Sequence, residues 1–395
     1  MLDLKVADAM FSLLRTVLRD DSKLSNEEVE IIKDNLHEMY AVSKRNDMAH
    51  LVGYALEKHG LISPEDEIFA KFQKQQYLAM YRCEGMEYEI ARMRDTLENG
   101  EIDFVLLKGA VIRELYPEGW MRTSSDIDIL VHREDLDRAE ELLLNKLEYK
   151  KGIEGTHDHS FHSSGGVHVE LHFTLLEDER ANFARDVLAE AWKYAIVSDG
   201  KKHEHVFLDE FFYFYHIAHL AKHIERAGSG IRPFIDIWLI NKGEQKNDDV
   251  RRELLERCEI DDFANLCEEL ANYWLGERNS VSDKVKMLEM FVLNCGIYGS
   301  EENRIAVSRK KRKSTFGYVF SRVFMGYSGL KTFYPIIKKH KWLIPFCQMA
   351  RWFKLLSGKT MRRAVNEIKV SANTSKKDVD DLQTFLFEIG LNKKQ

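Results

Sequence analysis

Two carboxylates stand two residues apart in the segment SSDIDILV at 124–131. Acidic residues alternate there with branched apolar residues, so a β-strand would project Asp126 and Asp128 from the same face. Two carboxylates on one strand face repel each other unless a cation lies between them. The spacing therefore favours a site for a divalent metal ion.

A second alternating segment, GVHVELHF at 166–173, adds a third carboxylate, Glu170. Two Asp on one strand and an acid on an adjacent strand form the arrangement used in two-metal nucleotidyl transfer. Two Mg²⁺ ions would then bracket the attacking and leaving oxygens at the α-phosphorus. One face of this strand is apolar and the other polar, comprising Val167, Val169 and Leu171 against His168, Glu170 and His172.

Short elements must hold these side chains in place. The run FVLLKGAVI after Asp103 predicts a strand, a turn at Gly109 and then a brief helix. A helical pattern from Glu134 to Leu147 would connect the two acidic strands. Strands and helices in this order predict an α+β core.

The stretch LLKGAVIRELYPEGWMRTSSDIDILV at 106–131, followed by a helix and then HVELHF, resembles the nucleotidyltransferase superfamily of the DNA polymerase β type. It is most similar to a poorly characterised branch in which a Lys-Gly pair precedes an Arg and a DxD strand. The core motifs cover about residues 103–175, and weaker resemblance continues at 215–240 and 333–352.

The resemblance implies a mixed sheet with flanking helices that binds an NTP with Mg²⁺, or Mn²⁺, and transfers its nucleoside monophosphate. In that scheme Asp126 and Asp128 hold the metals, and Glu170 completes the metal site or activates the acceptor. The turn at Lys108 and Gly109 would face the triphosphate. AMP is the default group to transfer, because the motifs select no base.

The chain departs from the superfamily at its phosphate contact. The Ser that usually follows the glycine is replaced by Ala110, and 16 residues, 110–125, separate Gly109 from Asp126. An ammonium, a guanidinium fork or a hydroxyl can each bind phosphate oxygens. Candidates are Lys108, Arg122, Ser124 and Ser125, although Arg122 could instead neutralise the acidic pair and Lys108 could be a surface residue.

Three histidines, His216, His219 and His223, share one face of a helix predicted over 209–226. Such a face could bind zinc or iron, line a substrate pocket or satisfy packing. In the next predicted helix Arg232 and Asp236 are four residues apart, so we expect a structural ion pair between them.

Four regions divide the chain: helical 1–100, the catalytic core 101–205, a helical region 206–300 closing the nucleotide cleft, and a helical region 301–395. In the first region Ser25 and Glu28 predict a capping box, and Ser63 with Pro64 predicts a helix start. Asn99 with Gly100 predicts a helix end.

Charge is distributed unevenly. The chain has 395 residues, with 58 Lys and Arg against 65 Asp and Glu, yet residues 303–370 contain 17 Lys and Arg and the single acid Glu367. Aromatic residues are interleaved with these basic residues. They could pack as a core against the acidic remainder, or the segment could bind an anionic membrane surface, nucleic acid or another polyanion.

No uncharged run reaches the roughly 20 residues needed to span a bilayer, and the acidic N-terminus is unlike a signal peptide. Five cysteines without a CxxC pair indicate reduced thiols. We therefore expect a cytoplasmic protein, with the inner membrane surface as a peripheral location. The acceptor could be a small molecule, a tRNA or a protein, and the alternative function is a non-catalytic nucleotide-binding or membrane-peripheral scaffold of the same fold.

Overall fold

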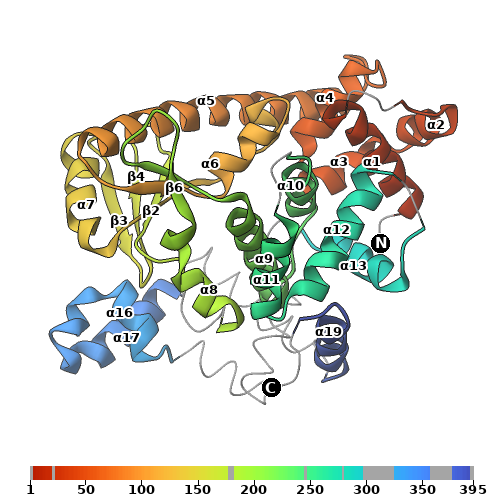
Figure 1. Cartoon of the computed structure of the whole chain (residues 1–395). Helices are drawn as coiled ribbons and strands as arrows, with labels where there is room; N and C mark the ends of the chain where they lie inside the picture. The colour runs from red at the N-terminus through yellow and green to blue at the C-terminus, as the bar shows by residue number, and fades with distance from the viewer. Residues whose placement is uncertain are drawn as a thin grey trace.

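A seven-stranded mixed sheet forms the centre of the computed structural model (Figure 1). The structure describes residues 3–19, 23–176, 182–243, 247–277, 280–296, 324–355 and 376–391. The strand order is β3-β4-β5-β2-β1-β7-β6. The strands are β1 Phe104–Leu106, β2 Asp126–Val131, β3 Lys150–Glu154, β4 Asp158–His162, β5 His168–His172, β6 Ala195–Val197 and β7 Glu204–Phe207.

Two parallel pairings, β2 with β5 and β1 with β7, interrupt an otherwise antiparallel sheet. A helix and the β3–β4 hairpin lie between β2 and β5 in the chain. The two strands predicted to carry the acids are therefore neighbours in space. Their register places Asp126 beside His168 and Asp128 beside Glu170.

One face of the sheet is covered by α5 (Phe69–Asn99) and α7 (Leu136–Asn145). Figure 1 shows α5 running along the upper edge of the molecule, from the N-terminal helices to the sheet. Apolar residues of β2 and β5 join the core beneath these helices, among them Ile127, Ile129, Val169 and Leu171. Because side chains alternate along a strand, the carboxylates of the same strands lie on the opposite face.

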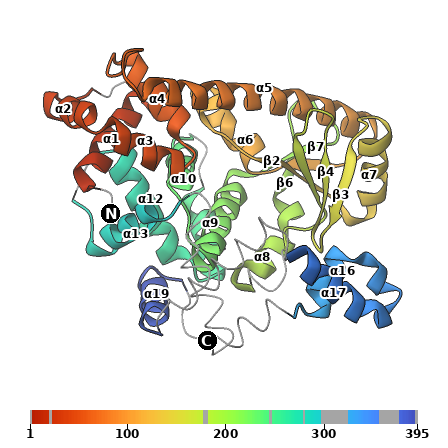
Figure 2. The ribbon, with the colours of Figure 1, turned by 180° about the vertical axis from the view of Figure 1, so that it is seen from behind.

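The N-terminal helices share a second core with the helices that follow the sheet. Phe11 of the first helix stacks on Trp274 with ring centroids 4.3 Å apart. Figure 2 shows the two groups side by side. The helices concerned are α1 Leu4–Leu18, α2 Asn26–Asp34, α3 Leu36–Arg45, α4 Ala49–Lys58, α9 Asp209–Arg226, α10 Arg232–Ile240, α11 Asp248–Arg257, α12 Asp261–Leu275 and α13 Asp283–Asn294.

Shorter elements complete the described chain. Near the sheet they are α6 Gly109–Ile112, η1 Arg113–Leu115, η2 Gly119–Met121, η3 Arg133–Asp135, η4 Asn182–Ala184, α8 Arg185–Ala189 and η5 Ala191–Tyr194. Toward the C-terminus they are α16 Tyr327–Phe333, η6 Pro335–Lys338, η7 Lys341–Leu343, α17 Ile344–Leu355 and α19 Lys376–Glu388. Among the described helices, none is both long and apolar enough to cross a membrane.

The local signals at the N-terminal helices have mixed outcomes. The capping box of Ser25 and Glu28 is confirmed, and α5 ends at Asn99 as predicted. The helix start at Ser63 and Pro64 is wrong. Ser63 donates its backbone N–H and its hydroxyl to Asp66, which holds a turn, and α5 begins only at Phe69.

The predicted α+β fold class, a mixed sheet with flanking helices, is confirmed. The four-region division of the chain stays a prediction. All five cysteines are buried, and none of them is in a disulfide. Within the basic region 303–370, the structure describes residues 324–355, and the cluster RKKRK at 309–313 lies outside the described residues.

Candidate functional site

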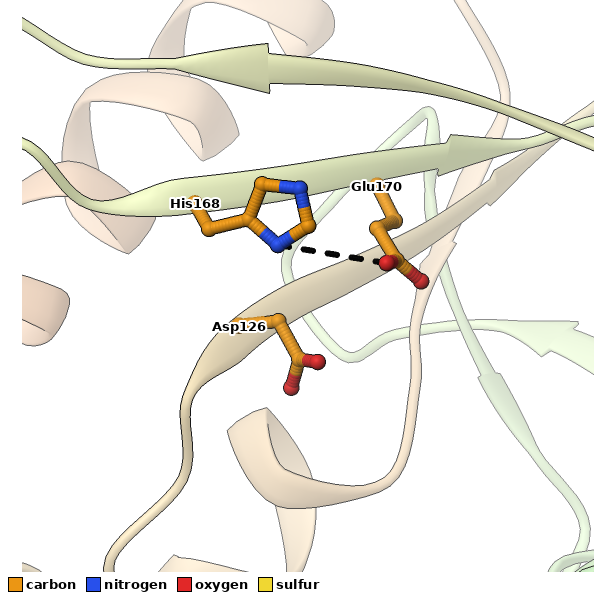
Figure 3. Close-up of side chains that lie close together, drawn as sticks. All are labelled: Asp126, His168 and Glu170. Carbon is orange, nitrogen blue, oxygen red and sulfur yellow. Dashed lines mark ion pairs between the residues drawn. The ribbon is translucent and has the colours of Figure 1, made fainter. Parts of the chain in front are cut away.

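The parallel pairing of β2 and β5 brings three carboxylates together. Figure 3 shows Asp126 on one strand facing His168 and Glu170 on the other. Potential metal-ligating atoms of Asp126, His168 and Glu170 all lie within 4.8 Å of one another. Atoms of Asp128, Glu170 and His172 form a second such group, so Glu170 belongs to both. The two groups could hold two cations about one shared carboxylate.

Asp128 is the buried member of the acidic pair, and two cationic groups compensate it. Nζ of Lys108 lies 3.4 Å from its Oδ2, and Nε2 of His172 donates a hydrogen bond to its Oδ1 at 2.9 Å. Burial alone would raise the pKa of Asp128. The charge of Lys108 and the hydrogen bond from His172 outweigh burial and hold that pKa well below its ordinary value.

His172 carries the complementary shift. Burial disfavours its charged form, but hydrogen bonds to Asp128 and Glu170 raise its pKa to about 9. Its Nε2 also lies 3.6 Å from Oε2 of Glu170. At neutral pH the metal-free site therefore contains an imidazolium between two carboxylates.

Asp126 is only half-buried and lacks comparable compensation in this arrangement. Burial, followed by the negative charges of Asp128 and Glu170, raises its pKa above the ordinary value. Ser125 is exposed and donates a hydrogen bond to Oδ2 of Asp126 at 3.3 Å. A bound cation would relieve the repulsion between Asp126 and its acidic neighbours, so electrostatics favour cation binding at this carboxylate.

The turn between β1 and α6 places Lys108 at the cluster. Lys108 adopts φ 42° and ψ −113°, a conformation that costs energy for a residue with a side chain. Gly109 does not have a positive φ, and a glycine is needed there because a side chain would not fit. A Cβ there would lie 2.7 Å from Nη1 of Arg122 and 3.0 Å from Cβ of Ser124.

Arg122 is buried against this turn, and its guanidinium binds Asp236. Its Nη2 and Nε donate to the two carboxylate oxygens of Asp236 at 2.9 and 3.2 Å, and Tyr116 donates its hydroxyl to Asp236 at 2.8 Å. Burial alone would raise the pKa of Asp236, but Arg122 lowers it below its ordinary value. The guanidinium fork is thus used for a carboxylate on α10.

This contact overturns the predicted ion pair between Arg232 and Asp236. Arg232 instead donates to the carbonyl oxygen of Thr123 at 2.8 Å and lies 3.5 Å from Asp47. An i, i+4 spacing decides pairing only where no better partner competes. Here the guanidinium of Arg122, from a loop distant in sequence, binds the buried carboxylate of Asp236 through two hydrogen bonds.

The two serines before the acidic strand have different environments. Ser124 is half-buried, and its Oγ accepts a hydrogen bond from Nη2 of Arg113 at 2.7 Å. Arg113 also donates to the carbonyl oxygen of Gly109 at 3.0 Å, which ties the two loops together. Arg113 was missed by sequence reasoning, since a buried arginine in a short apolar helix gives no periodic signal.

The three histidines of α9 do share one face, and they make local contacts. His216 lies 3.1 Å from the carbonyl oxygen of Pro233, and the Nε2 atoms of His219 and His223 are 2.9 Å apart. Burial, and then the charge of Lys108, lower the pKa of His219. Within the described chain, no third ligand completes a metal group with these histidines.

Comparisons with known proteins agree with this geometry. Searches of curated proteins and of solved structures found no match. The family described as "Uncharacterised nucleotidyltransferase" matches residues 33–276, which is more than half of the chain and includes every residue of the acidic cluster. The chain therefore belongs to this family of nucleotidyltransferases.

Proposed function

We propose that the protein is a divalent-metal-dependent nucleotidyltransferase that moves a nucleoside monophosphate, AMP by default, from an NTP to a hydroxyl or phosphate of an acceptor. The observation that carries this proposal is the carboxylate cluster on β2 and β5, in which Glu170 has ligand atoms within 4.8 Å of those of Asp126 in one group and of those of Asp128 in the other. Carboxylate oxygens are the ligands that Mg²⁺ prefers.

The residues present fit a pair of divalent cations. Asp126 is repelled by its acidic neighbours, and Glu170 belongs to both groups of candidate ligands. Such ions, when bound, supply charge neutralisation of the triphosphate and polarise the reacting oxygens. His168, and His172 once it has lost its proton, would add nitrogen donors, which a transition metal such as Mn²⁺ accepts more readily than the harder Mg²⁺.

The protein's own residues would then position the substrate and move one proton. Lys108 faces the acidic cluster and would bind the triphosphate through its ammonium group. The acceptor oxygen would form a bond to the α-phosphorus while the bond from that phosphorus to the α,β-bridging oxygen breaks. Pyrophosphate leaves with the electron pair, and the acceptor proton passes to Glu170.

Two of the proposed phosphate contacts have different roles in this scheme. Arg122 acts by positioning the Gly109 turn, because its guanidinium is bound to Asp236. Ser125 is the hydroxyl that would contact a phosphate, since it is exposed beside Asp126, whereas Ser124 is held by Arg113. Gly109 lets the backbone of the turn approach closely.

Calorimetric titration of ATP, GTP, CTP and UTP with Mg²⁺ tests the proposal. We expect binding of one nucleotide to wild type, and its loss in Asp126→Asn/Asp128→Asn. Asp137→Asn/Glu141→Gln is the matched control, because both residues are exposed on α7 and it also removes two negative charges. The nucleotide that binds is then used, with its α-phosphorus labelled, to screen acceptors.

Two results would contradict the proposal. If no NTP binds to folded wild type with Mg²⁺ or Mn²⁺, the cluster is not a nucleotide site. If the nucleotide binds equally well to Asp126→Asn/Asp128→Asn, it binds somewhere other than the acidic cluster.

A further inference from the structure

The elements α16, η6, η7 and α17, residues 327–355, form a small helical unit with very little core. Figures 1 and 2 both place α16 and α17 below the sheet, at the side of the molecule away from the N-terminal helices. Among the described side chains, the buried apolar residues of this unit are Leu330, Ile337 and Cys347, with a few half-buried neighbours. Most of its aromatic side chains therefore lie outside that core.

The exposed side chains form a continuous stripe along one helix face. Trp342, Phe346, Met349 and Phe353 follow the spacing i, i+4, i+7 and i+11, and all four are exposed. We call these four residues the aromatic stripe. The alternative in which the aromatic residues of the basic region form a core does not hold at these four positions, which are exposed.

The charged residues in the segment that carries the aromatic stripe are all basic. Residues 324–355 contain six Lys and Arg and no Asp or Glu. Lys339 and Lys341 are exposed immediately before the stripe. A solvent-exposed apolar face with a cationic border attracts a partner that is anionic at its surface and apolar beneath it.

We propose that α17 docks through the aromatic stripe on an anionic phospholipid bilayer. The helix has 12 residues, and a length of roughly 18 Å is too short to cross the hydrocarbon core, so it lies in the interface plane. Trp342, Phe346 and Phe353 enter the boundary between headgroups and acyl chains, while Lys339 and Lys341 contact the headgroups. Met349, an unstacked thioether within the stripe, fits acyl chains better than nucleobases. This inference does not rest on the proposed nucleotidyl transfer.

Co-sedimentation of the full chain with vesicles tests the docking. We expect binding to vesicles of phosphatidylcholine with phosphatidylglycerol and none to pure phosphatidylcholine. Trp342→Ser/Phe346→Ser should lower the partition coefficient by roughly tenfold or more, because two apolar side chains no longer leave water. Lys339→Glu/Lys341→Glu should abolish the preference for anionic vesicles.

The chain offers a matched control for the stripe. Tyr77 and Tyr81 on α5 are 62% and 77% exposed, comparable with 69% and 60% for Trp342 and Phe346. Tyr77→Ser/Tyr81→Ser should bind vesicles like wild type. Because all four positions are on the surface, unchanged thermal unfolding would show that every variant is folded.

Fluorescence gives a readout of insertion that electrostatic adsorption alone would not. Lipids brominated on the acyl chain should quench the tryptophan emission of wild type. Trp342→Phe should keep vesicle binding but lose most of the quenching, because the other tryptophans are buried or half-buried.

Three outcomes would overturn the proposal. The first is an absence of binding to anionic vesicles, and the second is binding that the stripe variant does not weaken. The third is binding of an RNA oligomer, or self-association of the chain, that depends on the stripe while vesicle binding does not. The last result would assign the stripe to nucleic acid or to a second copy.

Discussion

At the scale of single residues, the two acids of β2 differ in what surrounds them. Asp128 is buried and compensated by Lys108 and His172, whereas Asp126 is half-buried and repelled by its neighbours. A buried compensated charge contributes to stability, while a repelled charge costs stability until a cation arrives. The same side-chain type therefore has its charge compensated at one position and left uncompensated at the other.

This difference predicts opposite effects of two like substitutions. In the absence of metal, Asp128→Asn should lower the free energy of unfolding by about 3–5 kcal/mol, because it leaves the buried His172 and the half-buried Lys108 without their counter-charge. Asp126→Asn should leave that free energy unchanged or raise it. Urea denaturation in EDTA measures both. Equal destabilisation by the two variants would contradict the assignment.

His172 predicts a pH dependence of the metal-free protein. Its folded pKa of about 9 is raised above the ordinary 6.5, so its contribution to stability is full below pH 6.5 and is lost as the pH rises through 9. The free energy of unfolding in EDTA should fall by a few kcal/mol over this interval. Denaturation at a series of pH values checks this.

The controls for this pH series are two substitutions. His172→Gln should remove the fall between pH 6.5 and 9. His37→Gln, at an exposed position on α3, should retain it. A decline that survives in His172→Gln would show that another group titrates.

At the scale of elements, α10 is joined to the loop before β2 by the buried pair of Arg122 and Asp236. The contact links a helix after the sheet to the strand that carries the acids. Arg122 in turn lies against the Gly109 turn, so the pair also supports Lys108. A substitution at Asp236 on α10 should therefore alter the acidic cluster indirectly, although Asp236 is not part of that cluster.

Asp236→Asn should destabilise the protein by about 3–5 kcal/mol, because a buried guanidinium loses its counter-charge. The exposed pair of Asp249 and Arg252 on α11 is the comparison, and Asp249→Asn should cost under about 1 kcal/mol. Thermal and urea unfolding measure both. A small effect of Asp236→Asn would mean that water or Tyr116 compensates Arg122.

Several elements were predictable because their signals are local. The alternation of polar and apolar residues predicts β2 and β5, and helical periodicity predicts α9. The acidic cluster then requires only that β2 and β5 be neighbours in the sheet. β3 was missed because all five of its residues are exposed at the sheet edge, so no apolar alternation marks it. The partner of Asp236 was also beyond reach, since 114 residues separate it from Arg122.

At the scale of the whole molecule, the N-terminal helices are not an appendage to the sheet. They share a core with the helices that follow it, as the stacking of Phe11 on Trp274 shows. The segment that precedes the acidic strands thus contributes to the helical core of the protein.

Phe11→Ala should lower the free energy of unfolding by about 3–5 kcal/mol, because a fully buried ring is removed from the shared core. Tyr81→Ala, at an exposed position on α5, should have little effect. Calorimetric unfolding checks both. We expect a single transition for wild type, and separate transitions would show that the two cores unfold independently.

The turn at residues 155–157, between β3 and β4, is exposed at Thr156 and divides the chain into two parts that each hold part of the cluster. Asp126 and Asp128 precede the turn, and Glu170 follows it. Neither fragment alone contains all three carboxylates of the cluster. A protein split at this turn should recover Mn²⁺ binding only when both fragments are mixed, so the cluster would report reassembly of the sheet.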